Sequence, residues 1–346
     1  MSDAVDRSPS IRPTRRTAPA NIAGVGAVTG YGWGRKHVWD GFLLGESAVR
    51  LTKGLEGYVD GGEAYLATIT DEGDRRDGPS RFMQALRFAA REAITDATER
   101  GWKPGRVVGV VHSIVLGDAE MWSDYYHEAP ERVRVKRWVN MLPSTVISQL
   151  MKENDFHGPA MSVSAMCASA NAGMITAKSW LDSGIATDVI LLATDLSGIP
   201  INLRRFKDLG VAVLDTPPLD GCRPFQEGSQ GFVGGEAAVA MVLSTEDTGA
   251  YASILGGVAL GRPGPVGVDV GHLGRVHAGG GERLEVAALE LVHVGGDSHQ
   301  VEGVHGHGAA EDRGVGTGVL GGEDHGHGGL AAHEAPAALL ERTATV

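Results

Sequence analysis

Apolar residues occur along this chain in two kinds of segment, which alternate between about residue 20 and about residue 245. Short continuous apolar runs predict buried strands, and segments with an apolar residue every three or four positions predict amphipathic helices. The predicted strands are 22–28, 106–111, 188–195 and 237–244. The predicted helices are 35–44, 80–100 and 145–152. Helices and strands that alternate in this way predict an α/β layered fold.

The predicted helix at 80–100 has well-marked ends. Ser80 is a good N-cap residue for its first turn, and Gly101 follows its last residue. Its apolar residues share one stripe: Phe82, Leu86, Ala89, Ala93 and Ala97. Gly45 ends the helix at 35–44 in the same way, and the helix at 145–152 follows Pro143. We therefore expect the 80–100 helix to bury its stripe against the sheet.

The segment 161–172, read as MSVSAMCASANA, predicts a short strand that leads into a further helix, which ends at Asp182–Gly184. This order places Cys167 in the first turn of that helix. There the free N–H groups and the positive end of the helix dipole favour thiolate over thiol, and the same N–H groups can hold an oxyanion. Cys167 is thus a candidate nucleophile. The alternative is a small structural cysteine at a strand-to-helix junction.

Composition narrows the classes of protein that fit. The chain has 346 residues, 42% of them hydrophobic, which suffices for one large or two moderate cores. Its two cysteines form no disulfide framework and suit a reducing compartment, so we expect a cytoplasmic protein with Cys222 in a structural role. The net charge of −12 argues against a nucleic-acid partner. Without an apolar run of 18 residues, no membrane span is predicted.

Four segments in the same order resemble the β-ketoacyl synthases, the condensing enzymes of the thiolase superfamily. The turn Ser164–Ala170 is similar to the family's T-A-C-S-S-type turn, with Cys167 at the acyl-accepting position. The other three are NIAGVGAVTGYG (21–32), FLLGESAVR (42–50) and GCRPFQEGSQGFVGGEAAVAMVLS (221–244). The resemblance covers about residues 21–245. It implies a thiolase-like five-layered αβαβα fold of two similar halves, of which the second is incomplete or not recognisable here.

The resemblance divides the chain into three parts. Residues 1–20, with four arginines and three prolines, are expected to form a disordered arm, and 21–250 the N-terminal ketosynthase domain. Residues 251–346 form an atypical tail in place of the C-terminal domain. Residues 256–346 hold 23 of the 51 glycines, and no Phe, Trp or Tyr follows Tyr251. Such a segment lacks the large side chains that fill a core. A shifted reading frame in a GC-rich gene would produce a segment of this composition.

The family implies a defined chemistry. Cys167 takes the acyl group from an acyl carrier protein, and two histidines stabilise the enolate formed when a malonyl thioester loses carbon dioxide. The tail offers His307 and His327, in His-Gly-His pairs, as the nearest counterparts, although the family's threonines and lysine are missing around them. The same histidine pairs allow an alternative of metal binding, but no metal or cofactor is predicted. Glu236, in the family's G-E-G turn, is expected to order the backbone.

Two functions from different classes remain open. One is a β-ketoacyl-[acyl-carrier-protein] synthase of fatty acid or polyketide synthesis, or a defective relative of one, for which the resemblance implies a homodimer. The other is a non-catalytic partner of a ketosynthase, like the chain-length factors, in a heterodimer. Two basic patches are candidate docks for the carrier protein: one is Arg132, Arg134, Lys136 and Arg137, and the other is Arg204, Arg205 and Lys207. A further alternative is that Gly24, Gly26 and Gly30 cradle a dinucleotide.

Overall fold

The computed structural model of the chain describes residues 19–127, 135–215, 217–224, 226–255, 257–258, 272–273 and 276–278. Contacts divide the chain into two units, Met1–Val304 and His305–Val346, and every described residue belongs to the first unit. The predicted arm up to residue 18 and most of the tail, with His307 and His327, lie outside the described residues.

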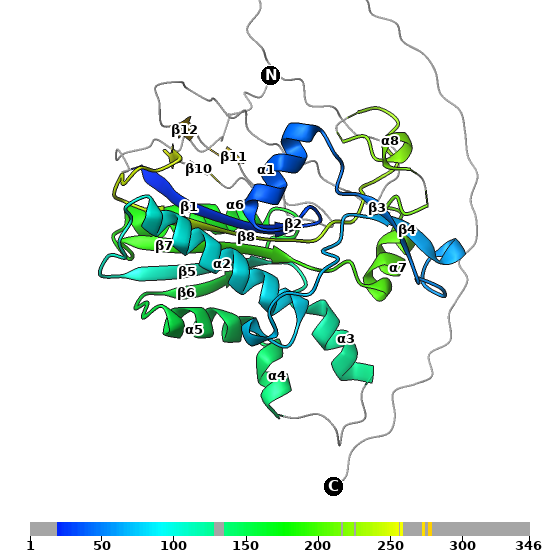
Figure 1. Cartoon of the computed structure of the whole chain (residues 1–346), viewed down its shortest axis with the longest axis horizontal. Helices are drawn as coiled ribbons and strands as arrows, with labels where there is room; N and C mark the ends of the chain where they lie inside the picture. The colour runs from blue at the N-terminus through cyan, green and yellow to red at the C-terminus, as the bar shows by residue number, and fades with distance from the viewer. Residues whose placement is uncertain are drawn as a thin grey trace, which may run out of the picture. The chain divides into compact units, whose positions relative to one another are not determined.

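A mixed eight-stranded sheet forms the centre of the described unit (Figure 1). Its strands, in spatial order, are β12 (Val276–Ala278), β9 (Ala252–Ile254), β1 (Ala20–Thr29), β8 (Ala237–Ser244), β7 (Asp188–Asp195), β5 (Val108–Ile114) and β6 (Ala160–Val163), with β2 (Gly32–Trp33) paired to β1. β5, β6 and β7 are parallel, and β8 is antiparallel to both β7 and β1. The four predicted strands are confirmed, although β5 begins two residues later than expected because Val107 bonds to Thr187 before the strand starts.

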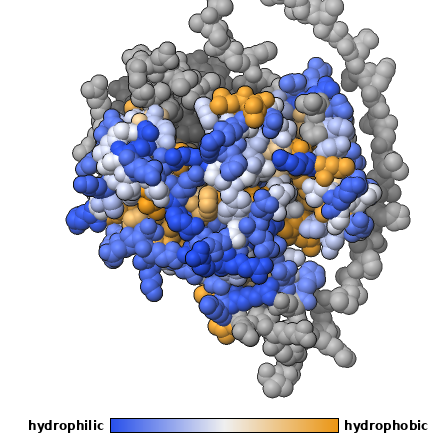
Figure 2. All heavy atoms as spheres, viewed as in Figure 1, coloured by the Kyte–Doolittle hydropathy of each residue, from blue (hydrophilic) through white to orange (hydrophobic). Residues whose placement is uncertain are grey.

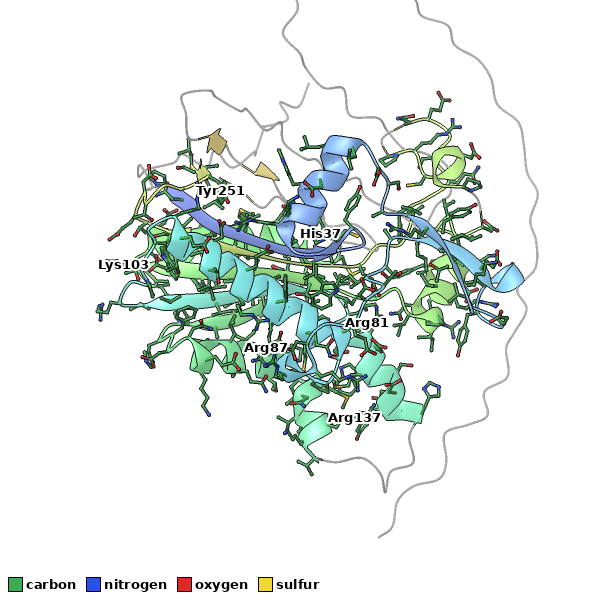
Figure 3. All side chains as sticks on the ribbon, viewed as in Figure 1. His37, Arg81, Arg87, Lys103, Arg137 and Tyr251 are labelled. Carbon is green, nitrogen blue, oxygen red and sulfur yellow. The ribbon has the colours of Figure 1, made fainter. Side chains whose placement is uncertain are left out.

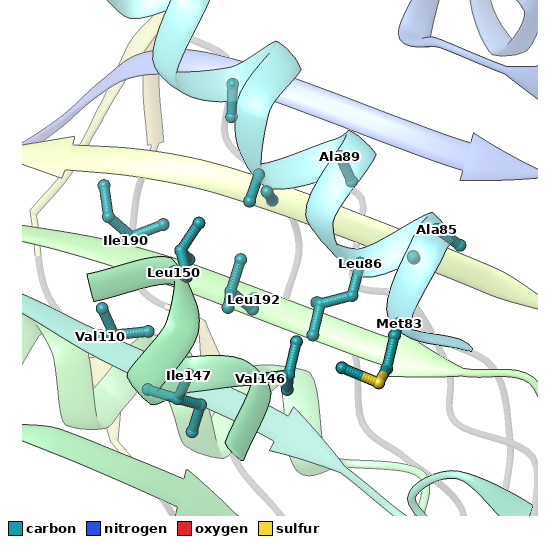
Figure 4. Packing of buried hydrophobic residues seen from close by; sticks show 14 of the residues in the cluster. Met83, Ala85, Leu86, Ala89, Val110, Val146, Ile147, Leu150, Ile190 and Leu192 are labelled. Atoms are coloured by element: carbon teal, nitrogen blue, oxygen red, sulfur yellow. The ribbon is translucent and has the colours of Figure 1, made fainter. Parts of the chain in front are cut away.

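Helices cover both faces of this sheet. α2 (Arg81–Glu99) and α5 (Pro143–Glu153) pack on one face, and α6 (Ser169–Asp182) packs on the other. Figure 4 shows Leu192 of β7 between Leu86 of α2 and Leu150 of α5, in one cluster of buried residues. The α/β layered prediction is therefore confirmed for the described residues. Among these, no helix combines the length and apolar character that crossing a membrane requires.

Smaller elements surround the sheet. They are α1 (Arg35–Leu44), α3 (Ala119–His127), α4 (Val135–Met141), α7 (Pro200–Asp208), α8 (Pro218–Gly221), β3 (Arg50–Lys53), β4 (Glu63–Leu66), β10 (Gly257–Val258) and β11 (His272–Leu273), with single 3₁₀ turns at Asp60–Gly62 and Arg75–Asp77. β3 pairs with β4, and β10 pairs with β11. A satellite core joins β4 to α7 through Leu66 and Leu203.

The predicted ends of α2 and the predicted C-terminal end of α1 are confirmed, whereas α5 begins two residues earlier than the predicted 145. The Ser80 hydroxyl accepts a hydrogen bond from the Met83 N–H at 3.2 Å, and all five residues of the predicted stripe on α2 are buried. Gly45 ends α1 in the left-handed conformation, with a φ of 66°. α5 begins at Pro143 itself, because proline's fixed φ and missing N–H suit the first turn of a helix.

α2 lies directly on the backbone of β1. A Cβ atom at Gly26 would stand 2.1 Å from the Ala89 carbonyl oxygen, and one at Gly24 would stand 2.2 Å from that of Ala93. These glycines therefore lie inside the strand, under a helix. They do not cradle a dinucleotide, because β1 leads into β2 and not into a phosphate-binding helix.

Two carboxylates of α2 supply hydrogen-bond acceptors to β1. The Val25 N–H donates to Asp96 and the Ala27 N–H to Glu92, both at 2.9 Å. Glu92 also accepts from the Arg35 N–H at the first residue of α1, and the Arg35 guanidinium lies 2.8 Å from Asp96. The carboxylates of α2 thus supply to these N–H groups of β1 the acceptors that a neighbouring strand would otherwise supply, and they fix the start of α1.

The sheet extends beyond the expected domain boundary at residue 250. The Tyr251 N–H donates to the Ile22 carbonyl, β9 pairs with β1, and β12 pairs with β9. The Tyr251 side chain, labelled in Figure 3, donates to Asp96 at 3.1 Å and faces the Arg100 guanidinium. The first residues of the predicted tail therefore complete the sheet.

Gly26→Ala is expected to lower the free energy of unfolding by about 3 kcal/mol, because its methyl group would overlap the backbone of α2. Urea unfolding measures the loss. Gly235→Ala is the matched control, since its new Cβ atom would stand 3.8 Å from the nearest atoms. Equal stability of the two variants would contradict the close contact between α2 and β1.

His112, on β5, is fully buried on the face that α2 covers. Its ring lies 6.0 Å from that of Phe82, and neither ring nitrogen hydrogen-bonds to another described residue. Burial lowers the pKa of His112 to about 4. The imidazole therefore stays neutral in the folded chain at a pH where the unfolded chain already binds a proton.

We expect the free energy of unfolding to fall by about 3 kcal/mol as the pH drops from about 6.5 to about 4 through His112. Over that range the unfolded state takes up the proton and the folded state does not. His112→Leu should flatten this slope in urea unfolding measured at several pH values. His157→Gln, which changes an exposed histidine, should leave the slope in place. A slope that His112→Leu does not change would contradict the assignment.

Candidate functional site

Cys167 lies in the connection between β6 and α6 and is exposed. Two backbone hydrogen bonds close this turn: the Ala168 N–H donates to the Ala165 carbonyl at 3.1 Å, and the Ser169 N–H to the Met166 carbonyl at 3.0 Å. Ala168 is the N-cap of α6, so Cys167 stands one residue before the cap and not in the first turn of the helix as the sequence suggested. It still lies next to the positive end of α6.

The residue before the cysteine is strained. Met166 has a φ of 50°, in the left-handed region that non-glycine residues rarely adopt. Such a conformation costs about 1–2 kcal/mol and persists only where surrounding interactions hold it. Met166 is itself 62% exposed, so its side chain does not supply that support by packing. The strained turn presents the sulfur of Cys167 to solvent.

Glu236 is held by backbone and by an arginine. Its Oε2 atom accepts from the Ile69 N–H at 3.0 Å and from Arg81, at the start of α2, at 3.2 Å (Arg81 is labelled in Figure 3). Burial raises the pKa of Glu236, and the Arg81 charge and the Ile69 N–H oppose that shift. These contacts agree with the expected role of Glu236 in ordering the backbone.

The remaining predicted residues are not brought to Cys167 by any described contact. Cys222 is half-buried just after α8, and both cysteines are free. His307 and His327, and with them the possible metal site of the tail, lie outside the described residues. Within the described ranges, no three His, Cys, Asp or Glu side chains gather as metal ligands would.

The two basic patches differ in their surroundings. In the first, Lys136 is exposed on α4, Arg137 lies 3.4 Å from Asp124, and Arg132 and Arg134 fall outside the described residues. In the second, on α7, each base has an acidic neighbour at 2.8–3.1 Å: Arg204 and Arg205 contact Asp208, and Lys207 contacts Asp60. These neighbours offset the positive charge of the second patch.

Sequence reasoning missed the left-handed conformation of Met166, the burial of His112 and the role of Arg81. The first two have no indication in the sequence, since both depend on packing. The position of Arg81, directly after the cap of an apolar helix, was a signal that could have been used.

Comparison with known proteins identifies the relatives of this site. The family profile "Beta-ketoacyl synthase, N-terminal domain" matches residues 18–248. Nodulation protein E of Rhizobium sp. (strain N33) is 26% identical over 234 residues, which are 65% of this chain and 57% of that protein. The 3-oxoacyl-[acyl-carrier-protein] synthase 2 of Staphylococcus aureus is 27% identical over 252 residues, 68% of this chain and 62% of the relative. The chain therefore spans about three fifths of the length of these relatives.

Solved structures share the fold. A chain of the AntDE:AntF structure, an acyl-carrier protein in complex with its ketosynthase, superimposes with a TM-score of 0.60 at 20% identity, covering 71% of this chain and 64% of that one. A chain of the complex between the ketosynthase ApeO and its chain length factor ApeC, from Xenorhabdus doucetiae, gives 0.57 at 17% identity, with 72% and 64% covered. At such identities the likeness concerns the fold, which is the thiolase-like one that the sequence predicted. By its profile match and its fold, this chain belongs to the β-ketoacyl synthase family and contains that family's N-terminal domain.

Proposed function

We propose that this chain performs the acyl-transfer step of a β-ketoacyl synthase, with Cys167 as the acyl acceptor. The observation that carries the proposal is the exposed cysteine on a strained turn next to the N-terminus of α6. Membership in the β-ketoacyl synthase family supports it. The resemblance of Ser164–Ala170 to the family's T-A-C-S-S-type turn supports it as well.

The chemistry follows from that position. The Cys167 thiolate attacks the carbonyl carbon of an acyl thioester, and a backbone N–H of the turn stabilises the tetrahedral oxyanion. The carbon–sulfur bond to the carrier breaks, the carrier thiol leaves with a proton, and the acyl group remains on Cys167. Condensation then requires a malonyl thioester to lose carbon dioxide and its carbanion to attack the acyl group. For that step we propose His307 and His327 as the candidate residues.

The donor in this proposal is an acyl carrier protein, an acidic partner that a basic surface attracts. Of the two candidate docks, the patch containing Lys136 and Arg137 is the better supported, since Asp60 and Asp208 offset the charge of the other. We also place the protein in the cytoplasm, on the basis of its two free cysteines.

We propose that two copies associate through β6. This strand forms one end of the described sheet, its residues Ala160–Ser162 are exposed, and Met161 is 45% exposed. A strand at the end of a sheet presents N–H and C=O groups that a second strand can bond.

A second candidate function is that of a partner subunit without condensing activity. The apolar side chains on α1 favour association with another ketosynthase chain: Trp39, Phe42, Leu43 and Leu44 are 63–71% exposed, and Figure 2 shows apolar surface over this helix. Exposed patches of this kind mark interaction sites. The presence of a cysteine at position 167 favours the catalytic role. Whether Cys167 can be acylated decides between acyl transfer and the partner role.

An acyl thioester of a carrier protein should add one acyl group to the chain, as seen by intact mass. Cys167→Ala should abolish the addition, and Cys222→Ala should retain it. Chloroacetyl reagents at neutral pH should label Cys167 about ten times faster than Cys222, because Cys167 is exposed and Cys222 is half-buried. If Cys167 reacts no faster than in the urea-unfolded chain and takes up no acyl group, the partner role is favoured over acyl transfer.

Met161→Lys should shift the protein from dimer to monomer in sedimentation at micromolar concentration, because a charge on the sheet edge opposes strand pairing. Ile185→Lys, at an equally exposed residue in the connection between α6 and β7, is the matched control and should remain dimeric. Dissociation of both variants, or of neither, would contradict an interface at β6.

A further inference from the structure

We propose that Ser169 is a positioning residue for Cys167: its hydroxyl holds the strained turn in the conformation that presents the sulfur. This inference rests on the proposed role of Cys167 as acyl acceptor. Ser169 is the first residue of α6 and only 4% exposed, so it is not placed to meet substrate. Its effect on the reaction would pass through the backbone of the turn.

The Ser169 hydroxyl joins three backbone positions. The Ala165 N–H donates to its oxygen at 2.8 Å, before the cysteine in the turn. The hydroxyl proton has the Met166 carbonyl oxygen as its nearer acceptor, at 2.7 Å, and the Ile114 carbonyl oxygen at 3.1 Å. The Ser169 side chain thus donates one hydrogen bond and accepts another, and both partners are backbone groups next to Cys167 in the turn.

One of these contacts and one backbone hydrogen bond support the strained residue itself. The Met166 carbonyl receives both the Ser169 hydroxyl and the Ser169 backbone N–H, the latter at 3.0 Å. Because a left-handed non-glycine residue persists only where its surroundings fix it, these two bonds account for the conformation of Met166. Since Cys167 is the next residue, the direction of its side chain depends on the same bonds.

The contact with Ile114 places the turn against the sheet. Ile114 is the last residue of β5, and its carbonyl oxygen lies 3.1 Å from the Ser169 hydroxyl oxygen, as the more distant of two acceptors for the same proton. α6 can approach β5 this closely because residue 173 is glycine: a Cβ atom there would stand 2.1 Å from the Ser113 hydroxyl oxygen. The turn that carries Cys167 is therefore fixed relative to the sheet.

Three variants of the full chain test this role. Ser169→Ala removes the hydroxyl, and Ser169→Thr retains it. Ser179→Ala is the matched control, because its hydroxyl donates to the Ile175 carbonyl at 2.8 Å in the same helix but far from the turn. The readouts are amide hydrogen exchange over residues 160–172, the pH profile of iodoacetamide alkylation of Cys167, the rate of Cys167 acylation and the melting temperature.

Ser169→Ala should speed exchange in the turn about fivefold, which corresponds to the loss of one hydrogen bond. It should slow acylation about 10- to 100-fold, as a misplaced reacting group does, and alter the alkylation profile, with a melting temperature close to that of Ser179→Ala. Ser169→Thr should resemble wild type. A purely structural role would move the melting temperature alone.

Unchanged exchange, alkylation and acylation in a folded Ser169→Ala would overturn the inference. If Ser169→Ala does not fold, Ser169→Thr decides: wild-type exchange and alkylation support the inference, and a loosened turn in the folded threonine variant contradicts it. If wild-type Cys167 accepts no acyl group, the proposed function fails, whereas exchange and alkylation still test whether Ser169 holds the turn.

Discussion

The close contact between α2 and the backbone of β1 is the constraint on which the described structure depends. Glycine at positions 24 and 26 lets the helix approach until only small residues fit between the two elements. At that distance Asp96 accepts a hydrogen bond from the Val25 N–H group of β1, and Glu92 accepts one from the Ala27 N–H group. The same two carboxylates hold Arg35 and Tyr251, so the start of α1 and the return of the chain at β9 depend on α2.

A second close contact, on the other face, sets up the candidate site. α6 rests on β5 through Gly173, and its first residue reaches the end of that strand. The two contacts have the same physical basis. In each, a glycine lacks the side chain that would keep the helix away from the strand, so polar side chains of the helix come near enough to contact backbone groups. On the first face the result is a stable sheet, and on the second face it is a turn that tolerates the strain at Met166.

The described unit has the character of one half of a larger fold. It matches the N-terminal domain of its family and spans about three fifths of its relatives' length. A short helix that exposes four large apolar side chains is costly in isolation, and their burial against another surface would recover hydrophobic free energy. This accounts for our expectation that the site of Cys167 operates within an assembly.

The sequence determined the elements and singled out Cys167 as the candidate nucleophile. Helix caps, the stripe on α2 and the apolar runs of β7 and β8 are local patterns, so their bounds could be predicted nearly to the residue. The family's motifs placed Cys167 on its turn. Only the tertiary structure decided that Gly24 and Gly26 lie under a helix, that His112 is buried with no hydrogen-bond partner among the described residues, and that Ser169 lies against Ile114. Each of these depends on residues distant in sequence, and periodicity carries no information about which elements pack together.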